Sequence, residues 1–234
     1  GKRLAAKLGV PFLDTDRAVI AETGITAEPL TFHSNGGLLP VATVERLPVL
    51  SCLSGPAAGV VGAAAIGERS GIADLITFDV GGTSTDVSLV QKGIPVVRTD
   101  NEVAGYPLRV PMLDIHTVGA GGGSIARVDA GGALRVGPDS AGADPGPACY
   151  GRGGTQPTTT DAHLIVGHLD TSERLGGEVG LDLDAARRAM QALADRIGIA
   201  SAEELALGVI RLAVAKMTSA IKEISIARGH DPRD

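Results

Sequence analysis

Glycine-rich turns divide the middle of this 234-residue chain into short apolar segments, and this spacing limits the structures that it can form. Between residues 73 and 137, runs rich in Val, Ile and Leu alternate with Gly and Asp, as in short β-strands joined by tight turns. The chain contains 33 glycines but only 2% aromatic residues, so its core must be built from Ala, Val, Leu and Ile. We therefore expect a β-rich middle region with a core of small side chains.

Helical patterns lie on both sides of this β-rich region. Small residues at helical spacing predict a helix over about 56–69 that ends at Gly71. The segment 137–154 contains nine Gly or Pro residues and predicts no regular element. The C-terminal part carries three further helical patterns, at residues 161–169, 181–198 and 201–229. In the last of these, Ser201 and Glu204 stand at the spacing of a capping box.

The charge balance excludes two classes of partner. The formal net charge is −6, the isoelectric point is near 5.4, and no cluster of Lys and Arg occurs, so we expect neither a nucleic-acid nor an acidic membrane surface. Cys52 and Cys149 have neither zinc-site nor redox-motif spacing, which is typical of a reduced protein. Because the sequence shows no signal peptide and no apolar run of about 18 residues, we expect a cytoplasmic protein.

Residues 77–90, TFDVGGTSTDVSLV, join two apolar strands by a markedly polar turn. Glycines in such a turn allow positive φ and bring backbone N–H groups close to a bound anion. Short hydroxyl side chains suit phosphate oxygens, and Asp79 suits a divalent cation or water placed between it and the phosphate. The candidate cofactor-binding residues are Gly81, Gly82, Thr83, Ser84 and Thr85. The alternative is an ordinary Gly-Gly hairpin whose Asp and Thr side chains bond only to turn amides.

A second candidate site lies in LDIHTVGAGGGS, residues 113–124. Asp114 and His116 are two positions apart, so in an extended strand their side chains share one face, about 7 Å apart at Cα. A carboxylate and an imidazole so placed can bind a divalent metal or transfer a proton. The alternative, which spacing alone favours, is an ordinary Asp–His hydrogen bond. The glycines that follow would let a substrate or phosphate approach the backbone, or would simply form turns.

A third candidate, Cys149, lies in the proline-punctuated loop of residues 137–154. Free cysteines are often small buried apolar residues, whereas a thiolate can bind a metal or act as a nucleophile. We favour a metal ligand or a structural thiol over a nucleophile. Asp161, at the start of a predicted helix, is expected to be its N-cap or to support the same site.

Several motifs, taken in order, resemble one family. They are HSNGGL (33–38), LSGPAAGVVGA (53–63), FDVGGTSTDVSL (78–89), MLDIHTVGAGGGSIARVD (112–129), VGPDSAGADPGPACYGRGG (136–154), TTTDAHLIVGHLD (158–170) and ARGHDPRD (227–234). They are similar to the hydantoinase A/5-oxoprolinase family, which also includes the ATP-binding subunits of acetone and acetophenone carboxylases. Within them, FDVGGTSTDVSLV looks like the phosphate-binding hairpin of the actin, sugar kinase and Hsp70 superfamily.

The resemblance implies a domain organisation and a fold. We expect residues 27–234 to form a hydantoinase A-like catalytic and ATP-binding domain, incomplete at its C-terminus, and residues 1–26 to be a segment of uncertain origin. The implied fold is α/β: an actin-like ATPase (ribonuclease H-like) lobe with an inserted β-rich region at 106–137 and C-terminal helices. Its mixed sheet should have five strands, begin with the hairpins of residues 73–99 and be flanked by the C-terminal helices.

The activity implied by the resemblance is ATP-dependent opening of a cyclic amide, such as 5-oxoproline or a hydantoin, through phosphorylation of the amide oxygen. Residues 81–85 would hold the phosphates of ATP, and Asp79 would orient Mg²⁺ or water. Asp114 and His116, together with Cys149, would hold a transition metal such as Zn²⁺ or polarise the substrate. The expected partner is a second subunit or domain of hydantoinase B type, and we expect this chain to be inactive alone.

Two other functions remain open. The same motifs would serve the ATP-binding subunit of an acetone- or acetophenone-type carboxylase, which phosphorylates a ketone and bicarbonate. A non-enzymatic actin-like protein would use ATP only as a switch. The polar residues at 114 and 116 and the loop at 137–154 speak against that second alternative, because a scaffold needs no such cluster.

Overall fold

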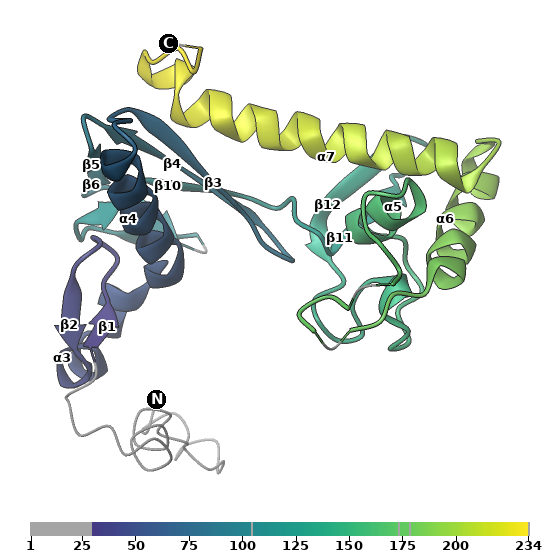
Figure 1. Ribbon diagram of the computed structural model, residues 1–234, viewed down its shortest axis with the longest axis horizontal. Helices are drawn as coiled ribbons and strands as arrows, with labels where there is room; N and C mark the ends of the chain where they lie inside the picture. The colour runs from purple at the N-terminus through teal and green to yellow at the C-terminus, as the bar shows by residue number, and fades with distance from the viewer. Residues whose placement is uncertain (1–29, 104, 173, 178, 234) are drawn as a thin grey trace. The chain divides into compact units, whose positions relative to one another are not determined.

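The computed structural model describes residues 30–233 except positions 104, 173 and 178, and the expectation for residues 1–26 lies outside this part (Figure 1). The chain divides into two compact units. The first contains the described residues up to 73 together with 90–114, and the second contains 74–89 and 115–233.

The first unit combines a short hairpin, helical segments and paired strands. β1 (Leu30–Phe32) and β2 (Leu38–Pro40) pair antiparallel around a turn in which His33 N–H donates to Gly37 O at 2.8 Å. The helical segments are α3 (Val41–Arg46), η1 (Pro48–Ser51) and α4 (Ser54–Arg69). The short strands are β5 (Ile94–Pro95), β6 (Val97–Arg98), β7 (Asn101–Val103), β8 (Tyr106–Leu108) and β9 (Met112–Leu113). β6 pairs with β9, and β7 with β8.

The helix predicted over 56–69 is confirmed as α4. Its buried residues are Ala57, Val60, Ala64 and Gly67. Its end matches the glycine signal in the sequence, because Gly71 has a φ of +72° and Ile72 N–H donates to Gly67 O at 2.8 Å. A residue with a side chain would be strained in this left-handed conformation, which explains why the helix ends where it does.

The second unit contains most of the main sheet. Its strands are β3 (Leu75–Val80), β4 (Thr85–Gln91) and β10 (Ile115–Val118), in the order β10-β4-β3. The last residues of β4 pair with β5, so the sheet has four strands in the part of the chain that the structure describes, and the expectation of five strands is wrong there. The inserted region at 106–137 is also corrected, because β10 lies within that range but pairs with β4.

A ribbon and three helices complete the second unit. β11 (Ser124–Val128) and β12 (Leu134–Ser140) form a separate antiparallel ribbon. The three predicted helices are confirmed as α5 (Thr159–Ile165), α6 (Leu183–Ile197) and α7 (Ala202–Ile224). The helices pack on one another, and α7 also lies along β12 (Figure 1). α7 starts where the sequence predicted, because the Ser201 side chain accepts from Glu204 N–H at 3.1 Å. No described helix is long and apolar enough to cross a membrane.

Aliphatic side chains and alanine fill the core of the second unit, as the composition predicted. Its buried members include Ala126, Val136, Cys149, Ala162, Leu164, Met190, Leu193, Leu205 and Val209. They come from β11, β12, the three helices and the short 3₁₀ helix η2 (Ala148–Tyr150). A second 3₁₀ turn, η3 (Ile226–Arg228), follows α7.

One buried carboxylate joins the glycine- and proline-rich loop to α5. Asp161, which is fully buried, accepts hydrogen bonds from Ala148 N at 3.2 Å, Cys149 N at 2.8 Å, and both Thr158 N and Thr158 Oγ1 at 2.8 Å. The N-cap of α5 is therefore Thr158, and the expectation that Asp161 is the N-cap is wrong. Asp161 instead closes a capping box and at the same time holds η2.

Replacing this carboxylate should be costly. In Asp161→Asn, one acceptor oxygen becomes an NH₂ group that faces N–H donors, so we expect the free energy of unfolding to fall by about 3 kcal/mol. Asp182→Asn is the matched control: Asp182 caps the start of α6, accepting from Ala185 N at 2.8 Å, and is exposed. Asn caps helices as well as Asp does, so the control should change little. Urea unfolding of both variants measures the difference, and equal losses would contradict this role for Asp161.

Candidate functional site

The polar turn predicted to bind phosphate connects β3 to β4. Gly81, Gly82 and Thr83 are exposed, and Gly81 N–H donates to Ser84 O at 2.8 Å. Asp79 is exposed near the end of β3. Thr85 differs from its neighbours: it is fully buried, and its hydroxyl donates to Ala120 O at 2.5 Å. Its side chain therefore anchors the base of the turn inside the protein.

The glycine segment 119–123 packs directly on the backbone of this turn. Gly122 N–H donates to Gly81 O at 3.0 Å, and Gly123 N–H donates to Gly82 O at 2.6 Å. In a trans peptide the C=O of one residue and the N–H of the next point in opposite directions. The N–H groups of Gly82 and Thr83 consequently point away from the glycine segment, on the exposed side of the turn.

Steric room explains why several positions around this turn are glycine. A Cβ added to Gly121 would lie 2.6 Å from Gly81 O and 2.9 Å from Gly82 O. A Cβ on Gly119 would lie 2.7 Å from Pro138 Cβ. The sequence left open whether these glycines admit a ligand or form turns; in the structure they let two backbone segments of the protein approach each other.

Two hydroxyl residues that the sequence analysis did not single out support the turn. Ser140, the last residue of β12, lies with its Oγ 3.4 Å from Thr83 Oγ1 and accepts from Gly142 N–H at 3.1 Å. Thr160, in α5, donates to Gly122 O at 2.9 Å. No local pattern marks either residue, because each meets its partner only through long-range packing.

Asp114 and His116 have different partners. Asp114 lies in the first unit between β9 and β10; it is 5% exposed, and one of its carboxylate oxygens is 3.9 Å from Arg98 Nη1. His116 lies in the second unit on β10, with Nε2 3.3 Å from Glu223 Oε2 of α7. The segment predicted as one extended strand thus changes partner at Asp114: β9 pairs with β6, whereas β10 pairs with β4.

The second acidic residue of the hairpin motif has a structural contact. Asp86 lies in β4 opposite Thr117 of β10, and Thr117 Oγ1 donates to an Asp86 carboxylate oxygen at 2.5 Å. A cross-strand hydrogen bond of this kind stabilises the pairing of the two strands. Of the two aspartates that flank the turn, Asp79 is therefore the better placed to serve a ligand.

Cys149 is enclosed by the core of the second unit. The residue is fully buried in the core of the second unit, and its N–H donates to Asp161. Burial raises the pKa of the Cys149 thiol well above its usual range, and the negative charge of Asp161 raises it further. A protonated, enclosed thiol is neither a nucleophile nor a ready metal ligand. Across residues 30–233, apart from the undescribed positions, no three His, Cys, Asp or Glu side chains gather as a metal site requires.

The first unit carries an open groove that contains none of the predicted site residues. It has a volume of about 370 Å³ and lies between α4 and the β5–β6 segment. Its lining includes Val61, Ala64, Glu68, Ile94 and Val97.

The burial of Cys149 and the raised pKa of its thiol predict slow chemical labelling of this residue. Because the thiolate is the reactive form, iodoacetamide at pH 8 should modify the half-buried Cys52 and leave Cys149 unmodified until the chain is unfolded in urea. Mass spectrometry of the two cysteine peptides measures this. Equal labelling of both cysteines in the folded chain would contradict a buried, protonated Cys149.

The same burial predicts a dependence of stability on pH. The unfolded thiol ionises near its ordinary pKa of about 8.5, whereas the folded thiol stays protonated, so its contribution is complete below that pH and is lost as pH rises further. The free energy of unfolding should therefore decline above about pH 8.5, more steeply in the parent chain than in Cys149→Ala. Urea unfolding from pH 7 to 10 tests this, and identical slopes would contradict it.

Comparisons with known proteins agree with the motifs. The model of the family described as Hydantoinase/oxoprolinase matches residues 13–234. Caprolactamase subunit alpha of Pseudomonas jessenii is 42% identical over 224 residues, which are 95% of this chain and 32% of that protein. 5-Oxoprolinase 1 of Arabidopsis thaliana is 38% identical over 222 residues, covering 88% of this chain and 17% of the relative.

Solved structures give the same result. A nucleotide-free structure of acetone carboxylase superposes with a TM-score of 0.84 at 32% identity, covering 92% of this chain and 30% of the other. The crystal structure of the ATP-dependent caprolactamase from Pseudomonas jessenii superposes with a TM-score of 0.77 at 41% identity, covering 94% of this chain and 32% of the other. This chain thus spans less than a third of each of these two proteins. The family match covers nearly the whole chain, and the chain therefore belongs to the hydantoinase/oxoprolinase family.

Proposed function

We propose that this chain supplies the phosphate-binding turn of an ATP-dependent enzyme that opens a cyclic amide. The observation that carries the proposal is the pair of adjacent N–H groups at Gly82 and Thr83, which point away from the glycine segment because Gly81 O and Gly82 O bind it. Successive backbone N–H groups that point the same way form an anion-binding concavity. In this proposal the turn belongs to one lobe of an actin-like ATPase fold.

Magnesium fits this turn through Asp79. The side chain is exposed, lies just before the turn and accepts no hydrogen bond from the described residues, so its carboxylate is available to a cation or to the water around one. Mg²⁺ prefers carboxylate and phosphate oxygens and keeps several waters. When bound, it would neutralise charge on the phosphates, while Asp79 holds it and Gly82 and Thr83 donate to the phosphate oxygens.

The reaction has a clear chemical reason. Amide resonance makes the ring carbonyl a poor electrophile, and an amide nitrogen is a poor leaving group. If the amide oxygen attacks the γ-phosphorus, a new O–P bond forms, the bond to ADP breaks, and the carbon becomes that of a reactive imidate phosphate. Water can then add to this carbon, and the bond from the carbon to the ring nitrogen breaks, which opens the ring, releases the nitrogen as an amine and leaves an acyl phosphate. A second water attacks the acyl carbon and releases phosphate, which carries the former amide oxygen. Such phosphoryl transfer needs mainly positioning and charge neutralisation, which the turn can provide.

Asp114 and His116 remain proposed contributors to the substrate side or to a transition-metal site of the complete protein. Glu223 belongs with His116 in that proposal, because a carboxylate beside an imidazole fixes its orientation. The burial of Cys149 favours its structural role. The names of the relatives, caprolactamase subunit alpha among them, support a second subunit as partner; that this partner is of hydantoinase B type remains our proposal.

A carboxylase function is the second candidate. The acetophenone carboxylase gamma subunit of Aromatoleum aromaticum is 39% identical over 210 residues, and the same turn would serve it. The two functions differ in which oxygen receives the phosphoryl group. A lactam labelled with ¹⁸O at its carbonyl would deliver the label to inorganic phosphate only in ring opening.

The turn can be tested directly by NMR on this chain. Titration with Mg²⁺-ATP should shift the amide resonances of Gly82 and Thr83 most, and Asp79→Asn should remove the dependence on Mg²⁺. Gly121→Ala forces a Cβ against Gly81 O and Gly82 O, so it should weaken nucleotide binding about tenfold.

The control for that substitution is Gly62→Ala. Gly62 is exposed in α4, and a Cβ there meets nothing within 4 Å. This variant should gain up to about 1 kcal/mol of stability and leave binding unchanged. The proposal fails if Mg²⁺-ATP shifts only resonances outside residues 79–85, or if Gly121→Ala binds nucleotide as the parent does.

A further inference from the structure

The β11–β12 ribbon places two arginines directly opposite each other. Arg127 and Arg135 are cross-strand partners, so their side chains start from the same face of the ribbon. Like charges in this position destabilise a strand pair. The ribbon therefore holds two positive charges side by side on one face.

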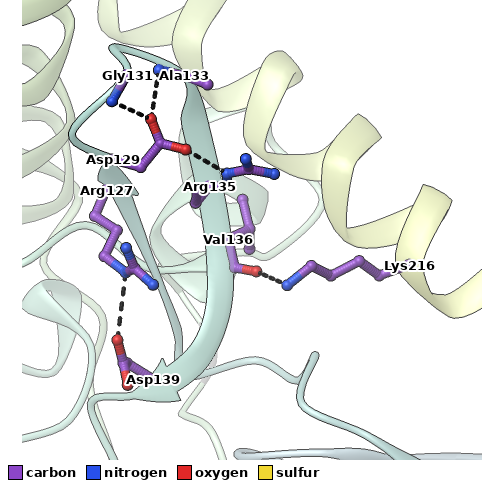
Figure 2. A network of polar contacts seen from close by, with 8 residues as sticks. All are labelled: Arg127, Asp129, Gly131, Ala133, Arg135, Val136, Asp139 and Lys216. Atoms are coloured by element: carbon purple, nitrogen blue, oxygen red, sulfur yellow. Dashed lines mark hydrogen bonds and ion pairs between the residues drawn. The ribbon is translucent and has the colours of Figure 1, made fainter.

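Asp139 and Asp129 each form an ion pair with one of the two arginines. Figure 2 shows Arg127 directed toward Asp139, with Nε and Oδ2 3.3 Å apart, and Arg135 directed toward Asp129, at 2.7 Å. Asp129 is already used by the hairpin turn, where its Oδ1 accepts from two backbone N–H groups at 3.0 Å. The closest contact of both ion pairs is at Nε, and among the described residues no hydrogen bond links a terminal NH₂ group of either arginine to the protein.

A third cation enters from α7. Lys216 donates to Val136 O on β12, beside the arginine pair (Figure 2). Burial lowers the pKa of Lys216, and the positive charges of Arg127 and Arg135 lower it further. The ammonium group therefore lies within the field of both guanidinium groups.

The charges in this cluster do not balance. Three cations, from Arg127, Arg135 and Lys216, face two carboxylates, in a chain whose net charge is −6. On the helices, by contrast, Arg187 is matched by a single partner, Glu203, at 3.4 Å. The cluster combines planar guanidinium forks with an ammonium group, which are the donors that bind phosphate oxygens in proteins.

We propose that Arg127, Arg135 and Lys216 form a binding site for a phosphate-type oxyanion. A tetrahedral dianion offers enough oxygens to meet the terminal NH₂ groups and the ammonium group together, and it would relieve the repulsion among the three cations. The ligand is either free phosphate or the phosphate group of a small phosphorylated molecule. This site is separate from the nucleotide turn at residues 81–85 and does not depend on the function proposed for that turn.

Protection of Lys216 from acetylation tests the site in the unaltered chain. A lysine with a lowered pKa reacts readily with acetic anhydride, and a bound dianion should slow its reaction about tenfold. Lys222, exposed on the same helix, is the internal control. Mass spectrometry would compare both lysines with inorganic phosphate, with glycerol phosphate and with chloride at equal ionic strength. The proposal predicts protection of Lys216 alone, by one or both phosphates, and chloride protection equal to that of phosphate would overturn it.

The two phosphate probes identify the source of the ligand. Protection by inorganic phosphate alone indicates the free ion, whereas stronger protection by glycerol phosphate indicates a phosphorylated molecule. Either outcome supports the site, and protection by neither contradicts it.

Variants supply an independent measurement. Phosphate affinity from ³¹P NMR titration should fall about tenfold in Arg127→Gln combined with Arg135→Gln. Arg187→Gln removes an exposed helical arginine of similar pairing and should bind phosphate as the parent does. Gly121→Ala should also leave this binding intact, which separates the cluster from the nucleotide turn. Equal affinity in the double variant and in Arg187→Gln would refute the proposal.

Discussion

The contact between two backbone segments, Gly122–Gly123 and Gly81–Gly82, determines the geometry of the candidate site. Its two hydrogen bonds fix the direction of the carbonyl groups at 81 and 82, and the planarity of the peptide then fixes the direction of the next two N–H groups. Any side chain at Gly121 would separate the two segments. The direction of those N–H groups thus depends on a close approach that only glycine permits.

A second constraint, the buried carboxylate of Asp161, organises the region behind that contact. It joins the loop that carries Cys149 to the start of α5, and α5 in turn places Thr160 against Gly122. Because a buried carboxylate must be fully hydrogen-bonded, the loop has little freedom to adopt another conformation. The same arrangement encloses Cys149 and raises the pKa of its thiol, so the support of the turn and the burial of the thiol have one cause.

Local sequence patterns predicted the elements well where a single signal decides them. The helix ended by Gly71 and the one capped by Ser201 are both present, because a left-handed glycine or a capping hydroxyl acts within one turn of chain. The polar turn was placed correctly between its two strands. The continuous strand through Asp114 and the N-cap at Asp161 were wrong, since strand partners and buried carboxylates depend on residues distant in sequence.

The sequence alone determined the family, the kinds of element and the position of the polar turn, because motif order and periodicity are properties of the chain itself. Only the tertiary structure decided which polar groups are buried and which partners they have. Thr85 and Cys149 are buried in the interior, and His116 lies beside Glu223. Lys216 of α7 lies beside the arginine pair of the ribbon. Burial and the direction of a hydrogen bond arise from packing between segments far apart in sequence, and no local pattern carries that information.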